Sequence, residues 1–336
     1  MPTTENARRE FLQRLATGAA ALPVAAVAAQ PLFGKPVPGL DRPKDPAAAP
    51  LSQYAFDVRD FGAVGDGKTL CTRAIQAAVD ACAKADGGKV IVPPGRFLTG
   101  PIFLRSNLEF EVLAGGTLLG SANFEDYPTM AGRWEGLDRT IFASLLTGDG
   151  LENVSITGRG VLDGQGAAWW DAHHKTADMR KNLGLTDREP QNPPGAPLKW
   201  PRPRMINLYR SRNVLIRGLS IVNSPSWNVH PVLCEDVCIE GLSIVNPGNS
   251  PNTDGIAPDS CKNVRISDCY VSTGDDCIVI KSGYKQIPRH PFAPSENIVV
   301  SNCVFGLGHC GVGVGSETAP QSSSARRRQP NRSSSS

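Results

Sequence analysis

A repeated pattern of polar and apolar residues constrains this chain more strongly than any other feature. Five segments have a polar residue followed by alternating apolar residues, and they begin at Asn153, Asn213, Asp236, Asn263 and Asn297. In the last four copies, apolar side chains recur at offsets +2, +5 and +7 from the first apolar residue; the first copy has Arg159 at +5 and Val161 at +7. Alternation with a period of two predicts strands, and the break between +2 and +5 predicts a corner.

The spacing of the copies predicts how they assemble. The last four copies begin 23, 27 and 34 residues apart, which fits one coil of a solenoid per copy. Stacked coils bury a continuous core that no single coil can bury. We therefore predict an all-β fold, a right-handed parallel β-helix. The 34 glycines, 28 prolines and 6% aromatic residues agree with a turn-rich β protein rather than a helical bundle.

Polar and sulfur-containing residues also have places on these coils. The Asn at the head of most copies predicts a ladder of stacked side chains with a structural role. Cys269 and Cys303 fall on core positions, where a thiol behaves as a small apolar group. The nine cysteines include no C-x-x-C pair, which argues against a structural zinc site. In an exported protein the cysteines can pair, whereas a chain that folds before export keeps buried thiols.

A helix is predicted ahead of the repeats. Residues 72–83 place apolar side chains on one face, which consists of Ile75, Val79 and Cys82. Thr69 or Thr72 is the expected N-cap. Because a solenoid exposes the core of its first coil, we expect this helix to cover that coil as an N-terminal cap. The first strands are predicted at residues 90–92, 97–98 and 108–112.

The chain divides into four segments. Residues 1–29 resemble a twin-arginine (Tat) export signal, with Arg8 and Arg9 followed by a mildly apolar run and small residues near Ala28. We expect a Pro/Ala-rich linker at residues 30–53, the β-helix domain at residues 54–317 and a disordered Ser/Arg-rich tail at residues 318–336. We therefore expect a periplasmic or secreted protein.

Charge and hydropathy exclude two classes of partner. The formal net charge is +3, and four arginines lie within residues 321–336, so the rest of the chain is near neutral. This charge balance predicts no nucleic-acid partner. A run of 18 or more apolar residues does not occur, so we expect no membrane span.

Acidic residues and a histidine fall in register on neighbouring coils. Asp254 and the three residues after it align with Asp276 and with Cys310 in the next two coils. Residues at equal positions on neighbouring coils lie roughly 4.8 Å apart, so Asp254 should face Asp276, and Asp275 should face His309. Clustered carboxylates cannot all ionise freely, and at least one should have a raised pKa. A protonated acid beside ionised bases is the arrangement that hydrolyses glycosidic bonds.

The same residues resemble a known family. Asn252-Thr253-Asp254, Gly274-Asp275-Asp276 and Gly308-His309 resemble three of the four signature motifs of glycoside hydrolase family 28, the polygalacturonases. Residues 60–69 resemble the N-terminal coil of that superfamily, and residues 224–227 and 281–283 resemble its bacterial, exported members. The resemblance implies a parallel β-helix that hydrolyses α-1,4 galacturonic acid linkages of pectic polysaccharide with inversion. It implies no metal and no cofactor, and we expect a monomer.

The resemblance also implies catalytic roles. Asp275 would be the general acid, while Asp254 and Asp276 would hold and activate the water. His309 would orient or tune Asp275. Substrate binding is expected at Asn252, Lys281 and His230. For Lys281 the alternative is a solvated lysine, and for His230 it is a structural histidine.

The sequence departs from the family pattern at two places. Cys310 stands where the family has Gly after the motif histidine. After Glu317 we find neither a further coil nor the family's Arg-x-Lys motif, so the resemblance predicts a C-terminus that is truncated and a domain without its last coils. The long segment 171–203 is expected to close one end of the groove, which favours exo action.

Three alternatives remain open from the sequence. Rhamnogalacturonan hydrolysis is a sister specificity, although the His309 motif argues against it. A calcium-dependent pectate lyase would use the same fold with a basic catalytic residue. A third possibility is a β-helix that binds polysaccharide without cutting it.

Overall fold

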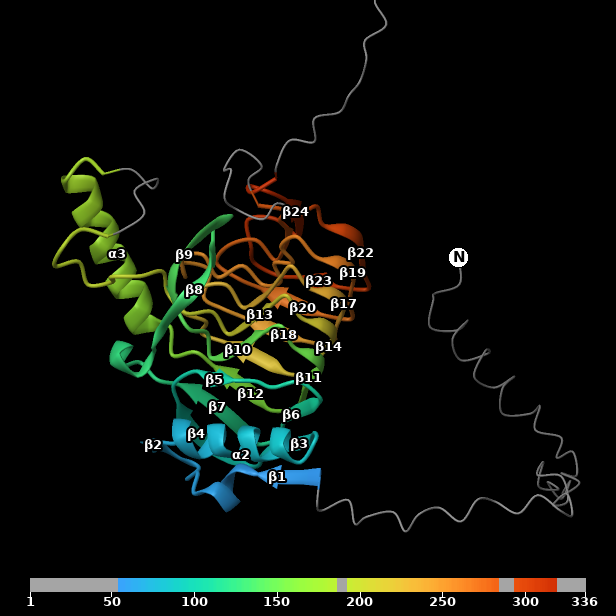
Figure 1. Ribbon diagram of the computed structural model, residues 1–336. Helices are drawn as coiled ribbons and strands as arrows, with labels where there is room; N and C mark the ends of the chain where they lie inside the picture. Colours follow the sequence, from blue (N-terminus) through green and yellow to red (C-terminus); the bar gives the residue numbers. More distant parts are fainter. Residues whose placement is uncertain (1–53, 186–191, 284–292, 319–336) are drawn as a thin grey trace, which may run out of the picture. The chain divides into compact units, whose positions relative to one another are not determined.

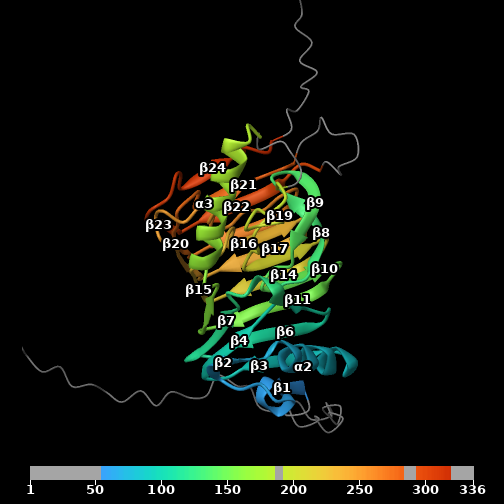
Figure 2. The ribbon, with the colours of Figure 1, turned by 90° about the vertical axis from the view of Figure 1, so that its left-hand side faces the viewer.

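The computed structural model describes residues 54–185, 192–283 and 293–318. The predicted export signal and linker lie outside the described residues, as does the predicted tail apart from Thr318. The described chain winds through three parallel sheets that surround one apolar core (Figures 1 and 2). The predicted parallel β-helix is confirmed.

Two sheets have eight strands each, and each strand pairs with the corresponding strand of the next coil. The first sheet contains β1 (Ala55–Asp57), β3 (Gly88–Val92), β6 (Leu108–Val112), β11 (Glu152–Gly158), β14 (Arg212–Arg217), β17 (Glu235–Glu240), β19 (Lys262–Ser267) and β22 (Glu296–Ser301). The second contains β2 (Asp66–Leu70), β4 (Gly95–Thr99), β7 (Gly116–Gly120), β12 (Val161–Asp163), β15 (Ser220–Val222), β18 (Ser243–Val245), β20 (Tyr270–Ser272) and β23 (Val304–Phe305).

The third sheet has two parts joined by single bridges. One part contains β5 (Ile102–Phe103), β10 (Leu146–Asp149), β13 (Ile206–Tyr209) and β16 (Val229–Val232), and the other contains β21 (Ile278–Ile280) and β24 (Val312–Val314). Ile256 and Asp259 bridge the two parts, because Ile256 pairs with both Val229 and Ile278. The third face is therefore continuous from β5 to β24.

Two excursions leave the coils on the side that faces the viewer in Figure 2. The first is an antiparallel hairpin of β8 (Thr129–Trp134) and β9 (Leu137–Phe142), which follows the short helix η3 (Phe124–Asp126). The second is helix α3 (Ala167–Asn182). The two excursions share a small apolar cluster, because Phe124, Tyr127 and Phe142 pack around Trp169 of α3.

The repeat positions line the core as predicted. Ile216, Ile239 and Ile266 pair in register on successive strands and are fully buried. Burial of each such side chain stabilises the fold by about 1.5–3 kcal/mol. The first copy corrects the prediction, because Leu162 rather than Val161 pairs with Ile221. The first copy has one residue more than the second between its paired core positions. Offset +7 therefore falls on Val161, one residue before the core position Leu162.

The predicted polar ladder is present on the first sheet. Asn213 donates to Asn153 at 2.8 Å, and Asn263 donates to Asp236 at 3.0 Å. All of these residues have a left-handed backbone, with φ between 53° and 56°, which Asn and Asp adopt at lower cost than most residues. The side chain of Asp236 has no N–H group that could donate to Asn213 and continue the ladder. The Asp236 carboxylate therefore interrupts a row in which all the remaining steps have a side-chain amide donor.

Helix α2 (Thr72–Lys84) lies at the N-terminal end of the coils (Figure 1). It packs against β1, β3, β5 and the short helix η2 (Val58–Phe61). The predicted face is buried, through Ile75, Val79 and Cys82, together with Ala78. The predicted N-cap is wrong: Cys71 occupies that position without a side-chain cap, because the Thr72 hydroxyl instead accepts from the Gly100 N–H at 2.7 Å.

Two further observations concern sulfur and membranes. All nine cysteines are free thiols, and Cys269 is buried whereas Cys303 is half-buried. Within the described ranges, no helix combines the length and apolar character needed to cross a membrane.

The interrupted ladder leads to a stability prediction. Asp236→Asn supplies the missing donor to Asn213 and preserves the left-handed backbone, so we expect a gain of about 0.5 kcal/mol in the free energy of unfolding. Urea unfolding of the variant should show a higher midpoint with an unchanged slope. Asp178→Asn, on the exposed surface of α3, removes the same charge outside the ladder and is the matched control. Equal midpoints for Asp236→Asn and the parent would contradict the ladder argument.

Candidate active site

Backbone hydrogen bonds between coils set the register of the acidic residues. The Gly255 N–H donates to the Asp276 carbonyl at 2.9 Å, and the Cys277 N–H donates to the Cys310 carbonyl at 2.9 Å. Ile256 pairs with Ile278, which pairs with Val312 on β24. Asp254, Asp276 and Cys310 therefore occupy equal positions on three successive coils. This is the register expected from the sequence.

The acidic residues gather in one cavity of about 260 Å³, which we call the carboxylate pocket. Its lining consists of Glu135, Trp227, Asn252, Asp254, Asp275, Asp276, Lys281, Ser316 and Glu317. Five of these residues were candidates from the sequence. The exposed His309 lies beside the pocket, where its Nδ1 is 3.1 Å from Oδ1 of Asp275.

Asp254 is the most strongly perturbed acid of the pocket. Only 4% of its surface is exposed, and its Oδ1 is buried with no hydrogen-bond partner among the described residues. Burial, and then the neighbouring Asp275 carboxylate, raise the pKa of Asp254 to about 8. The Lys281 ammonium, 3.9 Å from Oδ2, acts in the opposite direction. Asp254 therefore holds a proton at neutral pH, as one member of such a cluster must.

Lys281 is held by a second acid. Its Nζ lies 2.6 Å from Glu317, and both side chains are almost fully buried. Burial lowers the pKa of Lys281, but Glu317 and Asp254 raise it by more, so the ammonium remains charged. The alternative of a solvated lysine is therefore excluded for this structure. The sequence pattern marks Glu317 only as the end of the β-helix. Its pairing with Lys281 joins two coils, so it leaves no local signal in the sequence.

The Asp275–Asp276 pair is tightly arranged. The Asp276 N–H donates to Oδ1 of Asp275 at 2.9 Å, and the His309 N–H donates to the Asp275 carbonyl at 3.0 Å. One ligand atom from each of Asp275, Asp276 and His309 lies within 4.8 Å of the others. These three residues are the described group that has the geometry to hold a cation.

Cys310 interacts with this pair. Burial, and then the Asp276 carboxylate, raise the pKa of the Cys310 thiol to about 12. The thiol therefore stays protonated and presents an S–H to Asp276. The residue that departs from the family pattern thus contacts an acid of the pocket.

His230 does not line the carboxylate pocket. Its ring is fully buried, with its centroid 4.6 Å from that of Trp227 in an edge-on arrangement. Burial, and then the positive charges of Arg204 and Lys281, lower the pKa of His230 well below its ordinary value. The neutral ring therefore packs against Trp227 outside the pocket lining, and its Nε2 atom has no hydrogen-bond partner among the described residues.

The wall itself was not predicted. Trp134 and Trp227 stack with centroids 4.7 Å apart, and the buried Arg204 guanidinium lies 5.2 Å and 4.9 Å from the two rings. Glu135 reaches the pocket from the tip of the β8–β9 hairpin, where it and Gly136 both have positive φ. A two-residue Glu-Gly turn between strand-like segments was the signal in the sequence that indicates this hairpin.

The fold and the pocket define a class before any particular family. A parallel β-helix with clustered carboxylates on its third sheet resembles the pectin-degrading β-helix proteins. Residues 191–326 match the family model Glycosyl hydrolases family 28. Residues 55–128 match the model Rhamnogalacturonase A/epimerase, pectate lyase-like. Over residues 191–326 the chain is therefore similar to glycosyl hydrolases of family 28.

Relatives with known names extend over most of the described chain. A Vitis vinifera protein named "Probable polygalacturonase" is 39% identical over 256 residues, which cover 74% of this chain and 48% of the relative. An exo-poly-alpha-D-galacturonosidase of Dickeya chrysanthemi is 30% identical and covers 78% of this chain and 48% of its own length. The crystal structure of a Thermotoga maritima exopolygalacturonase has a TM-score of 0.70 and 38% identity, covering 79% of this chain and 63% of its own. The chain thus spans about half the length of these curated relatives.

The raised pKa of Asp254 predicts a pH-dependent stability. Because the folded state keeps this proton up to about pH 8 and the unfolded chain releases it near pH 3.8, stability falls as pH rises between these values. Asp254→Asn carries no ionisable group, so we expect it to match the parent near pH 4 and to exceed it increasingly toward pH 8. The gap should grow by at most about 1.4 kcal/mol per pH unit.

Urea unfolding of both proteins at several pH values measures this gap. The exposed Asp178→Asn variant is the control, and its difference from the parent should not grow with pH in this way. A constant difference between Asp254→Asn and the parent from pH 4 to pH 8 would show that burial does not perturb Asp254.

Proposed function

We propose that this chain hydrolyses α-1,4-galacturonosyl linkages in polygalacturonate by an inverting mechanism. The observation that carries the proposal is the convergence of Asp254, Asp275 and Asp276 from neighbouring coils in one pocket, where one carboxyl retains a proton at neutral pH. The match to the family 28 model and the named relatives support the choice of a galacturonan as substrate.

The proposed roles divide the proton chemistry among the three acids. Asp275, beside His309, protonates the glycosidic oxygen as the bond to the anomeric carbon breaks. Asp276 and Asp254 hold a water on the other face of the sugar and, in their ionised forms, accept its proton as it attacks. One bond forms and one breaks at the anomeric carbon, and the acid and base exchange their protonation states through solvent.

The raised pKa of Asp254 fits these roles through coupling. Among the charged neighbours of Asp254, Asp275 contributes most to the raised pKa, so the two carboxyl groups interact directly. When the proton resides on Asp275, that residue is ready as the acid and Asp254 is the base. Lys281 favours this arrangement, because its ammonium lies 3.9 Å from Asp254 and stabilises the ionised form.

Substrate binding and location form part of the proposal. Asn252 and Lys281 line the pocket and are proposed to contact the sugar, whereas His230 is proposed to support Trp227 from below. Relatives named exopolygalacturonase support cleavage at a chain end. The twin-arginine motif at Arg8 and Arg9 supports export to the periplasm or the exterior.

Loss of the acid tests the mechanism. Asp275→Asn should lower the release of reducing ends from polygalacturonate by about 10²–10⁴-fold, because the amide cannot donate the required proton. Asp178→Asn, exposed on α3, should retain parental activity. Undiminished turnover by folded Asp275→Asn would remove Asp275 from the acid role.

Product analysis separates hydrolysis from the alternatives. Saturated products formed in the presence of a calcium chelator support hydrolysis. Unsaturated products that require added calcium would instead identify a lyase, with a cation near Asp275, Asp276 and His309. Binding of polygalacturonate by the parent without any cleavage would identify a binding protein.

A further inference from the structure

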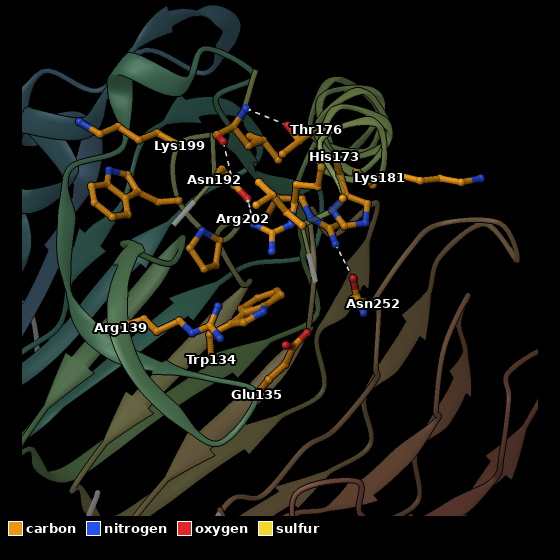
Figure 3. A pocket seen from close by; sticks show the side chains of 17 residues that line it. Trp134, Glu135, Arg139, His173, Thr176, Lys181, Asn192, Lys199, Arg202 and Asn252 are labelled. Carbon is orange, nitrogen blue, oxygen red and sulfur yellow. Dashed lines mark hydrogen bonds between the residues drawn. The ribbon is translucent and has the colours of Figure 1, made fainter. Parts of the chain in front are cut away.

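A second cavity of about 440 Å³ adjoins the carboxylate pocket, and we call it the outer pocket (Figure 3). The β8–β9 hairpin, helix α3 and the segment 192–202 enclose it. Glu135 and Asn252 belong to the linings of both cavities. The two pockets therefore adjoin at these two side chains.

The walls of the outer pocket are firmly anchored. Trp169 fixes α3, because its fully buried ring stacks on Phe124 with centroids 4.0 Å apart. Arg202 joins the pocket to the acid-bearing coil, since it donates to Oδ1 of Asn252 at 2.6 Å and to the Pro251 carbonyl at 2.8 Å. A ligand would meet a preformed surface, so little binding energy would be spent on ordering the protein.

The chemistry of the lining suits an anionic sugar. Its charged residues comprise one acid, Glu135, and five bases, which are Arg139, Arg180, Lys181, Lys199 and Arg202. In Figure 3 the Lys181 and Lys199 side chains point away from the cavity, whereas Arg139 extends from the hairpin beside Trp134 and the buried Arg202 lies near Asn252. The Nε atom of Arg139 is buried without a hydrogen-bond partner among the described residues.

Uncharged groups complete the lining. Trp134 and Trp200 provide apolar ring surface, of the kind that accompanies a few polar groups in ligand pockets. Burial, and then the charge of Arg202, lower the pKa of His173 to about 4. The neutral imidazole is therefore able to donate to or accept from a hydroxyl group without adding charge.

We propose that the outer pocket binds the third uronate residue of the substrate, next to the two residues that span the scissile bond in the carboxylate pocket. The uronate carboxylate would be held by Arg139, with Arg202 contributing positive charge, and the sugar ring would lie against Trp200. This inference rests on the proposed function. It makes α3 and the hairpin a specificity device for substrates of three or more residues.

Oligogalacturonides of two lengths test the proposal. For Arg139→Gln and for Trp200→Ala, the KM for trigalacturonate should rise about 10-fold with kcat within about two-fold, because the lost contacts act equally in the ground and transition states. The KM for digalacturonate should not change. Lys175→Gln on α3 is the control. Lys175 is exposed, pairs with Asp171 and does not line the outer pocket. Arg139→Lys, which keeps the charge, should recover part of the affinity.

Calorimetric binding separates failure of the pocket from failure of the proposed function. With Asp275→Asn as the background, trigalacturonate affinity should fall about 10-fold on Arg139→Gln or Trp200→Ala, while digalacturonate affinity stays constant. Equal effects on both sugars, or no effect on either, would overturn the outer pocket whether or not hydrolysis occurs. If no protein cleaves pectate but trigalacturonate binding still depends on Arg139 and Trp200, the binding site stands and the hydrolase proposal falls.

Discussion

Parallel hydrogen bonding between successive coils is the constraint on which the rest of this structure depends. It aligns each residue with its counterpart one coil away, so a single register determines both the inside and the outside of the β-helix. Ile239 and Ile266 stack in the core through the same pairing scheme that aligns Asp254 with Asp276 in the carboxylate pocket. A slip of one residue would turn the core side chains outward and would also separate the acids. Fold stability and site geometry are therefore coupled.

The carboxylate pocket concentrates buried charge that the coils must support. Lys281 and Glu317 form a buried ion pair, and Asp254 lies beside them with one oxygen that has no partner within the described part of the chain. Burial of a carboxylate without full hydrogen bonding is unfavourable unless it keeps its proton. The raised pKa of Asp254 is the result, and it keeps a proton beside Asp275, the proposed general acid. Here a feature that lowers stability at high pH is also the one that prepares the site.

The excursions from the coils add what a bare β-helix lacks. The hairpin brings Glu135 to both pockets and Trp134 to the outer pocket, and α3 forms the far wall of the outer pocket. Each excursion is anchored by aromatic packing, through Trp227 in one case and Trp169 in the other. The core coils thus position the acids, while the inserted elements shape the surface around them.

The sequence alone determined the coil architecture, since alternating apolar residues at regular spacing have few other ways to become buried. It also determined the alignment of Asp254, Asp276 and Cys310, because that alignment follows from counting residues within strands. The first copy escaped this count by one residue at Leu162, where the chain between the strands is longer. Tertiary structure alone decided that Lys281 pairs with Glu317, that His230 lies beneath Trp227, and that the hairpin and α3 form a second pocket. Those contacts join residues from different coils and insertions, and their burial and electrostatics depend on distances that no local sequence pattern encodes.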